Sequence, residues 1–371
     1  MRVVFSAGGT GGHINPALAA AGELKSRHPD AQILFIGAKD RMEATLVPNA
    51  GFKLETIKIS GFYRKISVKN LFKNAGTVLH IVTSSFQVKK ILKEFKPDVV
   101  VGFGGYASGP TLRTAAKMGI KTAIHEQNAY PGVTNKALAK EVDKVMLTVE
   151  AAKKHLKFKN EPVITGLPVR NEILCADRSF ARSELHLKDS DILILSMGGS
   201  QGAKIINKNI AGMITNLWKD KNLVFLHATG EYGKEWMPQM LRDAGVEIGD
   251  NVRIVEYINN MEVALPAADI VISRAGASSL SEIEAVGKAS ILIPSPNVAE
   301  NHQYHNAMSL VEKNAAKIIE EKDISPELLT KTVKELIDNP SLRAKLGENA
   351  LKMAKPESKK LICDIIESLA G

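Results

Sequence analysis

The sequence predicts an α/β protein built from two Rossmann-like, doubly wound domains. Three observations support this fold class. The length of 371 residues suits two domains better than one. Short apolar runs alternate with helical patterns along the whole chain, which is typical of parallel sheets with right-handed crossovers. Each half also opens with a strand that runs into a glycine-rich loop and then a helix, so we expect ligands in a cleft at the carboxyl ends of the strands.

In the first half, β-branched and aromatic runs predict strands near residues 2–6, 32–37, 53–59, 98–103, 121–125, 144–148 and 162–165. Helices are expected between them, near residues 15–27, 41–49, 70–94, 109–118, 133–140 and 150–156. Pro16 is expected in the first turn of the first helix, where its missing N–H costs nothing.

The second half repeats the pattern, with strands expected near residues 191–198, 222–229, 252–257, 269–276, 289–294 and 315–321. Helices fill the intervals, and the C-terminus is helical from about residue 340 with a break at Pro356. The segment 162–173 contains two prolines and a glycine, so we take it as the linker between the domains.

Composition and charge indicate which kinds of molecule the protein can bind. The hydrophobic content of 44% and charged content of 24% are typical of a soluble globular protein, and no signal peptide or membrane span is apparent. Two widely separated cysteines, Cys175 and Cys363, indicate reduced thiols in a cytoplasmic setting. Residues 1–165 hold 25 Lys and Arg against 12 Asp and Glu, so the basic half fits phosphorylated substrates or anionic lipid. With 5% aromatic residues and no recognition motif, nucleic acid is not expected.

Four loops rich in glycine or small residues follow predicted strands, at residues 8–13, 104–110, 198–203 and 275–282. In the last of them, Ser278 and Ser279 open a helix, so backbone N–H groups, hydroxyls and the helix dipole favour a diphosphate. Glu282 lies one turn further on, where its carboxylate can accept from the two hydroxyls of a ribose. The alternative role of Glu282 is a capping-box partner to one of the two serines.

His13 ends the first glycine loop and is the candidate general base. The positive end of the following helix disfavours the imidazolium form, and a neutral histidine can take a proton from an attacking hydroxyl. The alternative is that His13 only hydrogen-bonds the loop or a ligand.

No metal and no cofactor are expected. The chain has no Asp-x-Asp element that would hold a metal on a nucleotide, and N–H groups with a helix dipole can stabilise a departing diphosphate instead. His125, Glu126 and Gln127 are adjacent on a strand and alternate between its faces, so they do not converge on one ion. His302 and His305 lack an apparent third ligand.

The segment 58–96 has more apolar residues than one buried helix face requires, and lysines surround them. We expect interfacial contact with an anionic membrane surface through Leu71, Phe72, Leu79 and Phe86.

Seven motifs in this order and spacing resemble the MurG family: GGTGGHINPALA, GGYASGP, HEQNAYPG, GLPVR, GGSQGAK, SRAGASSLSE and ENHQYHNA. That family transfers N-acetylglucosamine from UDP-GlcNAc to a lipid-linked muramyl-pentapeptide acceptor, converting lipid I to lipid II in peptidoglycan synthesis. The resemblance implies the glycosyltransferase-B architecture: an acceptor and membrane-side domain over 1–165, a UDP-sugar domain over 166–350, and a helix over 351–371 that returns to the first domain. It also implies a peripheral protein on the cytoplasmic face of the bacterial plasma membrane, with partners in a wall-synthesis assembly.

The resemblance further implies roles for particular residues. The donor would be bound by Thr10, Gly11, Gly12, Asn128, Arg170, Ser200, Ile258, Ala277, Ser278, Ser279, Leu280, Ser281, Glu282 and Gln303. Of these, Glu282 would take the ribose hydroxyls, Ile258 would line the uracil pocket, and Asn128 and Gln303 would contact the sugar. We expect the acceptor side to comprise Gly104, Gly105, Tyr106, Ser108, Glu126 and Gln127. The sequence departs from the family at Leu167, where Asn is usual, which puts one polar contact near the linker in doubt.

Two other functions compete with this reading. One is a related enzyme on the same scaffold, either a lipid glucosyltransferase or a UDP-GlcNAc 2-epimerase. The other is a basic nucleotide-binding module that docks on anionic lipid without catalysing transfer. UDP release that requires an acceptor would separate transfer from epimerisation. Salt-sensitive binding to anionic vesicles without any transfer would support the binding module.

Overall fold

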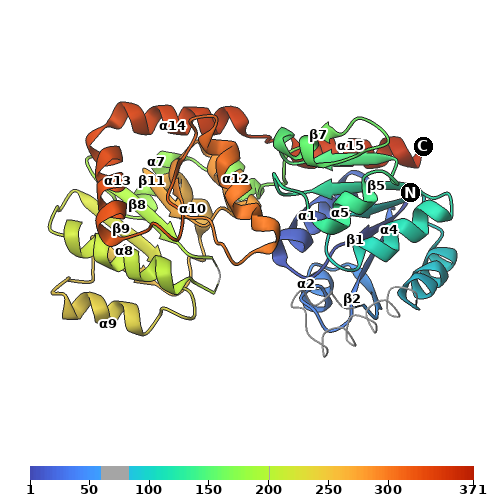
Figure 1. Ribbon diagram of the computed structural model, residues 1–371, viewed down its shortest axis with the longest axis horizontal. Coiled ribbons are helices and arrows are strands. Elements are labelled where there is room, and N and C mark those ends of the chain that lie inside the picture. The colour runs from blue at the N-terminus through green and yellow to red at the C-terminus, as the bar shows by residue number, and fades with distance from the viewer. Residues whose placement is uncertain (60–82, 200) are drawn as a thin grey trace. The chain divides into compact units, whose positions relative to one another are not determined.

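The computed structural model describes residues 1–59, 83–199 and 201–371, and the chain divides into two compact units (Figure 1). Unit 1 comprises Met1–Pro168 and Glu357–Gly371, and unit 2 comprises Val169–Pro356. Each unit holds one parallel β-sheet with helices on both faces, which confirms the predicted fold class. Among the helices in the described ranges, none combines the length and apolar character needed to cross a membrane.

The sheet of unit 1 has seven strands in the order β3-β2-β1-β4-β5-β6-β7. They are β1 (Arg2–Ser6), β2 (Gln32–Ala38), β3 (Lys53–Ile57), β4 (Val99–Gly102), β5 (Lys121–Glu126), β6 (Lys144–Leu147) and β7 (Val163–Ile164), as the sequence predicted. In β1, Val3 pairs with Ile33 on one side and with Val99 on the other. The strand order therefore reverses between β1 and β4, the place where doubly wound sheets bind their ligands.

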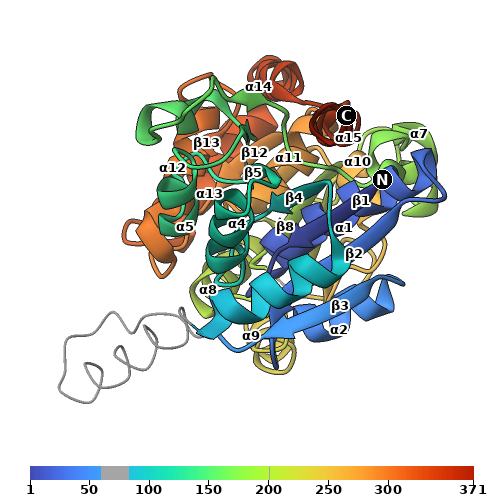
Figure 2. The ribbon, with the colours of Figure 1, turned by 90° about the vertical axis from the view of Figure 1, so that its right-hand side faces the viewer.

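Alternating side chains of β1 supply the two cores of unit 1. Phe5 packs on the face covered by α1 (Gly11–Arg27), α2 (Glu43–Asn49) and the C-terminal helix α15 (Ser358–Ala370). Val4 faces the opposite core, built with residues 83–95, α4 (Ser108–Lys117) and α5 (Val133–Leu138) (Figure 2). A helix near 150–156 is also present, as the 3₁₀ turn η1 (Glu150–His155).

The prediction that Pro16 lies in the first turn of its helix was wrong. Helix α1 begins at Gly11, so Pro16 lies in its second turn. Gly11 and Gly12 adopt helical conformations themselves, and the Thr10 carbonyl accepts from the N–H groups of His13 and Ile14 at 3.1 and 3.2 Å. His13 consequently lies inside the first turn of α1 and not ahead of it.

The sheet of unit 2 has six strands in the order β10-β9-β8-β11-β12-β13, so its order also reverses, between β8 and β11. The strands are β8 (Ile192–Met197), β9 (Leu223–Ala228), β10 (Val252–Val255), β11 (Ile270–Ser273), β12 (Ala289–Leu292) and β13 (Lys317–Ile318). One face packs against α8 (Lys204–Leu217), α9 (Trp236–Asp243) and α13 (Pro326–Asp338). The other packs against α6 (Asn171–Leu174), α7 (Arg178–Glu184), α10 (Met261–Ala267), α11 (Ala277–Ala285), α12 (His302–Val311) and α14 (Pro340–Met353).

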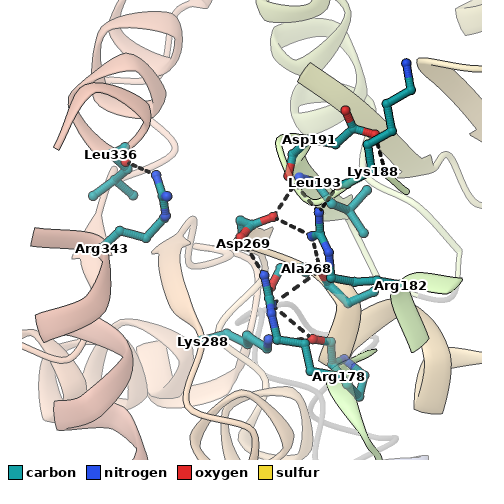
Figure 3. Close-up of polar contacts among 12 residues, drawn as sticks. Arg178, Arg182, Lys188, Asp191, Leu193, Ala268, Asp269, Lys288, Leu336 and Arg343 are labelled. Atoms are coloured by element: carbon teal, nitrogen blue, oxygen red, sulfur yellow. Dashed lines mark hydrogen bonds and ion pairs between the residues drawn. The ribbon is translucent and has the colours of Figure 1, made fainter. Parts of the chain in front are cut away.

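Two arginines one turn apart on α7 fasten that helix to the start of β11 (Figure 3). Arg178 and Arg182 each pair with a different carboxylate oxygen of Asp269, at 2.8 and 3.2 Å. Arg178 also donates to the carbonyls that end α10, including that of Ala268 at 2.9 Å. Lys288 donates to the Pro266 carbonyl in the same place, so this lysine and Arg178 share the carbonyls that end α10.

Candidate active site

The loops that follow β1, β4 and β5 meet at the carboxyl edge of the unit 1 sheet. Of the residues in the loop after β1 that are expected to bind the donor, Thr10 and Gly12 are exposed and Gly11 is half-buried. Only Gly9 in this loop takes a left-handed conformation, with φ of 86°. The glycines therefore allow one sharp turn at Gly9 and an early helix start, which leaves the loop open to solvent.

The carboxylate of Glu43, which the sequence did not indicate as a site residue, holds this loop in place by a hydrogen bond. Glu43 of α2 is fully buried, and it accepts from Gly9 N at 3.0 Å and from Ala38 N at 2.9 Å. A side chain at Gly8 would collide with the same carboxylate. One N–H of the loop is therefore already used, so the loop is not a bare phosphate cradle. A lone Glu in a predicted helix carries no sequence signal for this role.

His13 has two close neighbours from the adjacent loops. Its Nδ1 lies 2.9 Å from Gln127 Oε1, and its ring lies over Gly104, whose φ is 94°. A Cβ at Gly104 would stand about 3.0 Å from His13 Nδ1, so only glycine fits beneath the ring. The predicted base and two predicted acceptor-side residues are thus brought together.

The Gln127 contact continues into the sheet. Gln127 Nε2 lies 3.0 Å from the His125 carbonyl oxygen and 3.2 Å from His125 Nδ1. His125 Nε2 lies in turn 2.9 Å from the Gly166 carbonyl oxygen. Burial lowers the pKa of His125 to about 4, so its ring is neutral near pH 7. This chain of contacts links His13 to Gly166, just before the end of unit 1.

Glu126 points away from Gln127, as the alternation of strand side chains requires. It is buried, and its two oxygens accept from Asn128 N at 2.9 Å, Gly132 N at 3.1 Å and Asn135 Nδ2 at 2.8 Å. The structure thus assigns Glu126 to the shape of the 127–132 loop. Contact of Glu126 with an acceptor, and of Asn128 with a sugar, stay predictions.

The predicted acceptor-side loop after β4 has both buried and exposed members. The Ser108 hydroxyl is buried and lies 2.7 Å from the Ser6 carbonyl oxygen, which ties the loop to the end of β1. Gly105, with φ of 85°, stands so close to the Gly8 carbonyl that a side chain there would clash. Tyr106 is 51% exposed and is the member of this loop available to a ligand.

In unit 2, α11 begins immediately after β11 and its glycine turn. Gly276 is the N-cap and Ala277 the first helical residue, so Ser278 and Ser279 lie in the first turn as predicted. A capping box would need the carboxylate at the third helical position, whereas Glu282 occupies the sixth. The alternative role of Glu282 as a capping-box partner was therefore wrong.

Arg170 and Glu282, two predicted donor residues, form an ion pair. Arg170 Nε donates to Glu282 Oε1 at 3.0 Å, with the guanidinium half exposed and the carboxylate largely buried. Burial raises the pKa of Glu282, and Arg170 opposes this rise. The pair places an ionisable carboxylate and a cation beside the second turn of α11.

The other predicted donor residues of unit 2 differ in accessibility. Leu280 and Ile258 lie in the same buried core cluster, and the Ser281 side chain is buried too. Gln303 on α12 accepts from Ser295 N at 2.8 Å and so anchors the loop after β12. The described residues contain no group of three or more His, Cys, Asp or Glu placed to hold a metal ion.

A second network missed by the sequence analysis lies under the glycine loop after β8. Ser196 Oγ lies 2.8 Å from His227 Nδ1, and His227 Nε2 lies 3.2 Å from Asn207 Oδ1. Asn207 then donates to the Thr229 carbonyl at 2.8 Å, next to Gly202. All four residues are buried, and isolated polar residues in or beside apolar strand and helix patterns offered no signal for their pairing.

Four predicted residues lie outside the described part of the chain: Leu71, Phe72 and Leu79 among the membrane contacts, and the donor residue Ser200. Phe86, the remaining predicted membrane contact, is 71% exposed in the helical segment 83–95.

Comparison with known proteins places these features in a family context. Residues 3–147 match the glycosyltransferase family 28 N-terminal domain, and residues 193–362 match the glycosyltransferase family 28 C-terminal domain. The chain is 43% identical over 369 residues to UDP-N-acetylglucosamine--N-acetylmuramyl-(pentapeptide) pyrophosphoryl-undecaprenol N-acetylglucosamine transferase from Thermoanaerobacter sp. strain X514, with all of both chains covered.

Solved structures agree in fold. The crystal structure of Acinetobacter baumannii MurG is similar with a TM-score of 0.81 and 29% identity, covering 99% of each chain. The UDP-GlcNAc 2-epimerase from Neisseria meningitidis, solved bound to UDP-GlcNAc, has a TM-score of 0.65 at 14% identity, covering 99% of this chain and all of the epimerase. The likeness to the epimerase is one of fold alone.

Proposed function

The chain belongs to the MurG family of family 28 glycosyltransferases, and on that premise we propose that it transfers N-acetylglucosamine from UDP-GlcNAc to the muramyl 4-hydroxyl of the lipid-linked pentapeptide acceptor. The product is lipid II, the disaccharide precursor of peptidoglycan. The observation that carries this proposal is the 43% identity over the full length of the N-acetylglucosamine transferase from Thermoanaerobacter sp. strain X514. His13 in unit 1, and Arg170 with Glu282 in unit 2, are groups suited to the chemistry.

His13 acts as the general base on the acceptor. Its ring stands at the open edge of the unit 1 sheet, held from one side by Gln127 and with Gly104 beneath it. The 4-hydroxyl gives its proton to the imidazole while its oxygen forms a bond to C1 of N-acetylglucosamine. The C1–O bond to UDP breaks with its electron pair on the diphosphate, so the configuration at C1 inverts.

Glu282 and the first turn of α11 bind the donor. The ionised carboxylate accepts from the two ribose hydroxyls, and the N–H groups at Ala277, Ser278 and Ser279 face the diphosphate. Arg170 pairs with Glu282 in the structure and can transfer its interaction to the negative charge of the donor. Charge that develops on departing UDP is stabilised by these N–H groups and the helix dipole.

We expect no metal cofactor in this reaction, because the proposal rests on backbone and side-chain groups that can stabilise UDP directly. Transfer should keep its rate in EDTA and should not rise on addition of Mg²⁺. A strict requirement for a divalent cation would contradict this part of the proposal.

The enzyme is proposed to work as a peripheral protein at the cytoplasmic face of the plasma membrane, where its lipid-linked acceptor resides. Phe86 supports this, because a largely exposed phenylalanine lies beside Lys89, Lys90 and Lys93 in the helical segment 83–95. Apolar and basic groups on one helix suit contact with an anionic bilayer.

The test is UDP release from labelled UDP-GlcNAc by the purified protein, with and without the lipid-linked muramyl-pentapeptide. We expect release only with the acceptor, and label on the lipid product. Formation of UDP-N-acetylmannosamine without acceptor would instead indicate an epimerase, and donor binding without turnover would indicate a binding module.

The role of His13 is tested in the same assay. His13→Ala should lower kcat at least 100-fold, the usual scale for a general base, with little change in UDP-GlcNAc affinity. His28→Ala is the matched control, because His28 caps the opposite end of the same helix and pairs with Glu367 at 3.0 Å. An equal loss of donor binding in His13→Ala would contradict the assignment as base.

A further inference from the structure

We propose that Gln127 and His125 are positioning residues that fix the tautomer of His13, so that the neutral ring carries its proton on Nδ1 and presents Nε2 as the basic nitrogen. The inference deepens the proposed function, since it rests on His13 as the base. It follows from four contacts, which together leave one assignment of hydrogen-bond donor and acceptor for each atom.

The orientation of the Gln127 amide is set first. A carbonyl oxygen can only accept, so the atom of Gln127 that lies 3.0 Å from the His125 carbonyl must be the amide nitrogen. The second proton of that nitrogen faces His125 Nδ1 at 3.2 Å. Gln127 Oε1 is therefore the atom that faces His13.

His125 independently requires the same orientation. Its Nε2 lies 2.9 Å from the Gly166 carbonyl and must donate to it. The ring is fully buried and neutral, so Nδ1 has no proton and accepts from the amide nitrogen of Gln127. With the amide reversed, its oxygen would face both the His125 carbonyl and the Nδ1 lone pair, leaving three acceptors in contact without a proton.

The last contact determines His13. Gln127 Oε1 can only accept, and His13 Nδ1 lies 2.9 Å from it, so Nδ1 carries the proton in the neutral ring. The lone pair of the neutral ring is then on Nε2, the nitrogen away from Gln127. Without this contact, the proton would distribute over both nitrogens and part of the enzyme would lack the correct base.

The tautomer can be read directly in the unliganded enzyme. Long-range ¹H–¹⁵N correlation spectra of ¹⁵N-histidine protein at about pH 8.5, where imidazoles are ordinarily neutral, distinguish protonated from unprotonated ring nitrogens. The spectrum of His13→Ala identifies the His13 signals by their loss. We expect Nδ1–H in the native protein, and Nε2–H in the native protein would overturn the proposal.

Gln127→Met tests the contribution to rate, because it keeps the size of the side chain and removes both hydrogen-bonding groups. We expect a mixture of His13 tautomers and a fall in kcat of roughly 2- to 13-fold, the rate equivalent of one net hydrogen bond. The KM for UDP-GlcNAc should change less than about twofold, since the tautomer affects the chemical step and not donor binding.

Thr148→Val is the control for a loss of local stability. It removes a buried hydrogen bond of 3.0 Å to the Glu126 carbonyl, which lies beside the contacts that join His13, Gln127 and His125 but is not one of them. We expect an unchanged His13 tautomer and kcat in this variant. An unchanged tautomer and kcat in Gln127→Met would also overturn the proposal. If Gln127→Met does not fold, the native spectrum alone decides.

The outcomes separate this inference from the proposed function. The tautomer is read without substrates. If the protein shows Nδ1–H on His13 but transfers nothing to the lipid acceptor, the proposed function is refuted and the positioning role of Gln127 and His125 stands. If the protein transfers normally but shows Nε2–H, the proposed function stands and the positioning role is refuted.

Discussion

The buried carboxylate beneath the first glycine loop offers the sharpest test of how the candidate site is held. Glu43 accepts one hydrogen bond from the loop, at Gly9 N, and one from the end of β2, at Ala38 N. Glu43→Ala removes both acceptors and leaves two backbone N–H groups without their partners. The loop that leads into His13 then loses the hydrogen bond that ties Gly9 to α2.

The magnitude follows from those two contacts. An unsatisfied, largely buried N–H costs about 1–3 kcal/mol, and relief from burying a carboxylate offsets part of the loss. We expect Glu43→Ala to lower the free energy of unfolding of unit 1 by about 2–4 kcal/mol. Glu43→Gln keeps one accepting oxygen and should cost about half as much.

Gly8 supplies an independent probe of the same contact. Its backbone is not left-handed, so alanine is conformationally allowed, but a Cβ there would collide with the Glu43 carboxylate. Gly8→Ala should cost about 1–3 kcal/mol by displacing the carboxylate, and should cost little in the Glu43→Ala background. The double variant should therefore be more stable than the sum of the single changes by at least about 1 kcal/mol.

Hydrogen exchange of the β1 amides is the appropriate measurement. Both tryptophans of the chain, Trp218 and Trp236, belong to unit 2, so tryptophan fluorescence would not follow unit 1. Gly22→Ala is the matched control: this exposed position in α1 has no atom within 4 Å of an added Cβ. Gly22→Ala should stabilise by about 0.5–1 kcal/mol and should add independently to Glu43→Ala. Additive effects of the Gly8 and Glu43 substitutions would refute the reasoning.

Three further predictions concern ionisation and the membrane. Arg170→Ala removes the cation that opposes the raised pKa of Glu282, so UDP binding should be lost at a higher pH on acidification than in the native protein. Calorimetric titration with UDP between pH 5 and 8 measures the pH at which binding is half lost, and an unchanged half-loss pH would contradict the prediction. Burial lowers the pKa of Lys288 to about 7. Between about pH 7 and 10.5 the unfolded state therefore binds a proton that the folded state does not, so the free energy of unfolding should rise with pH by at most about 1.4 kcal/mol per pH unit. Lys288→Met should remove that rise in urea unfolding followed by tryptophan fluorescence, and parallel pH dependences of the two proteins would count against it. Phe86→Ser should reduce sedimentation of the protein with anionic vesicles. Phe180→Ser is the control, because Phe180 is 61% exposed but lies in unit 2, and it should leave sedimentation unchanged. Equal effects of the two substitutions would argue against a specific membrane contact at Phe86.

Much of the fold could be predicted because local pattern and global topology agree. Runs such as Arg2–Ser6 and Leu223–Ala228 are short and apolar and contain β-branched and aromatic residues, which favours strands buried on both faces of a sheet. The helical segments between such runs favour parallel pairing. Parallel strands carry their carboxyl ends to one edge of the sheet. The meeting of the loops after β1, β4 and β5 could therefore be expected from their order alone.

The start of α1 shows where local pattern fails. Gly11 and Gly12 have low helix propensity, which places a predicted helix start near Pro16. In the folded chain the Thr10 carbonyl accepts from His13 and Ile14, and the helix begins a turn earlier. Tertiary packing of α1 on the sheet outweighs the propensity of two glycines, since it buries a whole apolar face.

The sequence by itself determined the two doubly wound units, the positions of the glycine loops and the residue types available at their ends. Only the tertiary structure decided which side chains touch: His13 with Gln127, Gly9 with Glu43, and Arg170 with Glu282. Those pairs are separated by 114, 34 and 112 residues, and no local periodicity encodes them. The physical reason is that periodicity reports which face of an element is buried, whereas a hydrogen bond depends on distances of a few tenths of an ångström between elements, which packing of the whole unit sets.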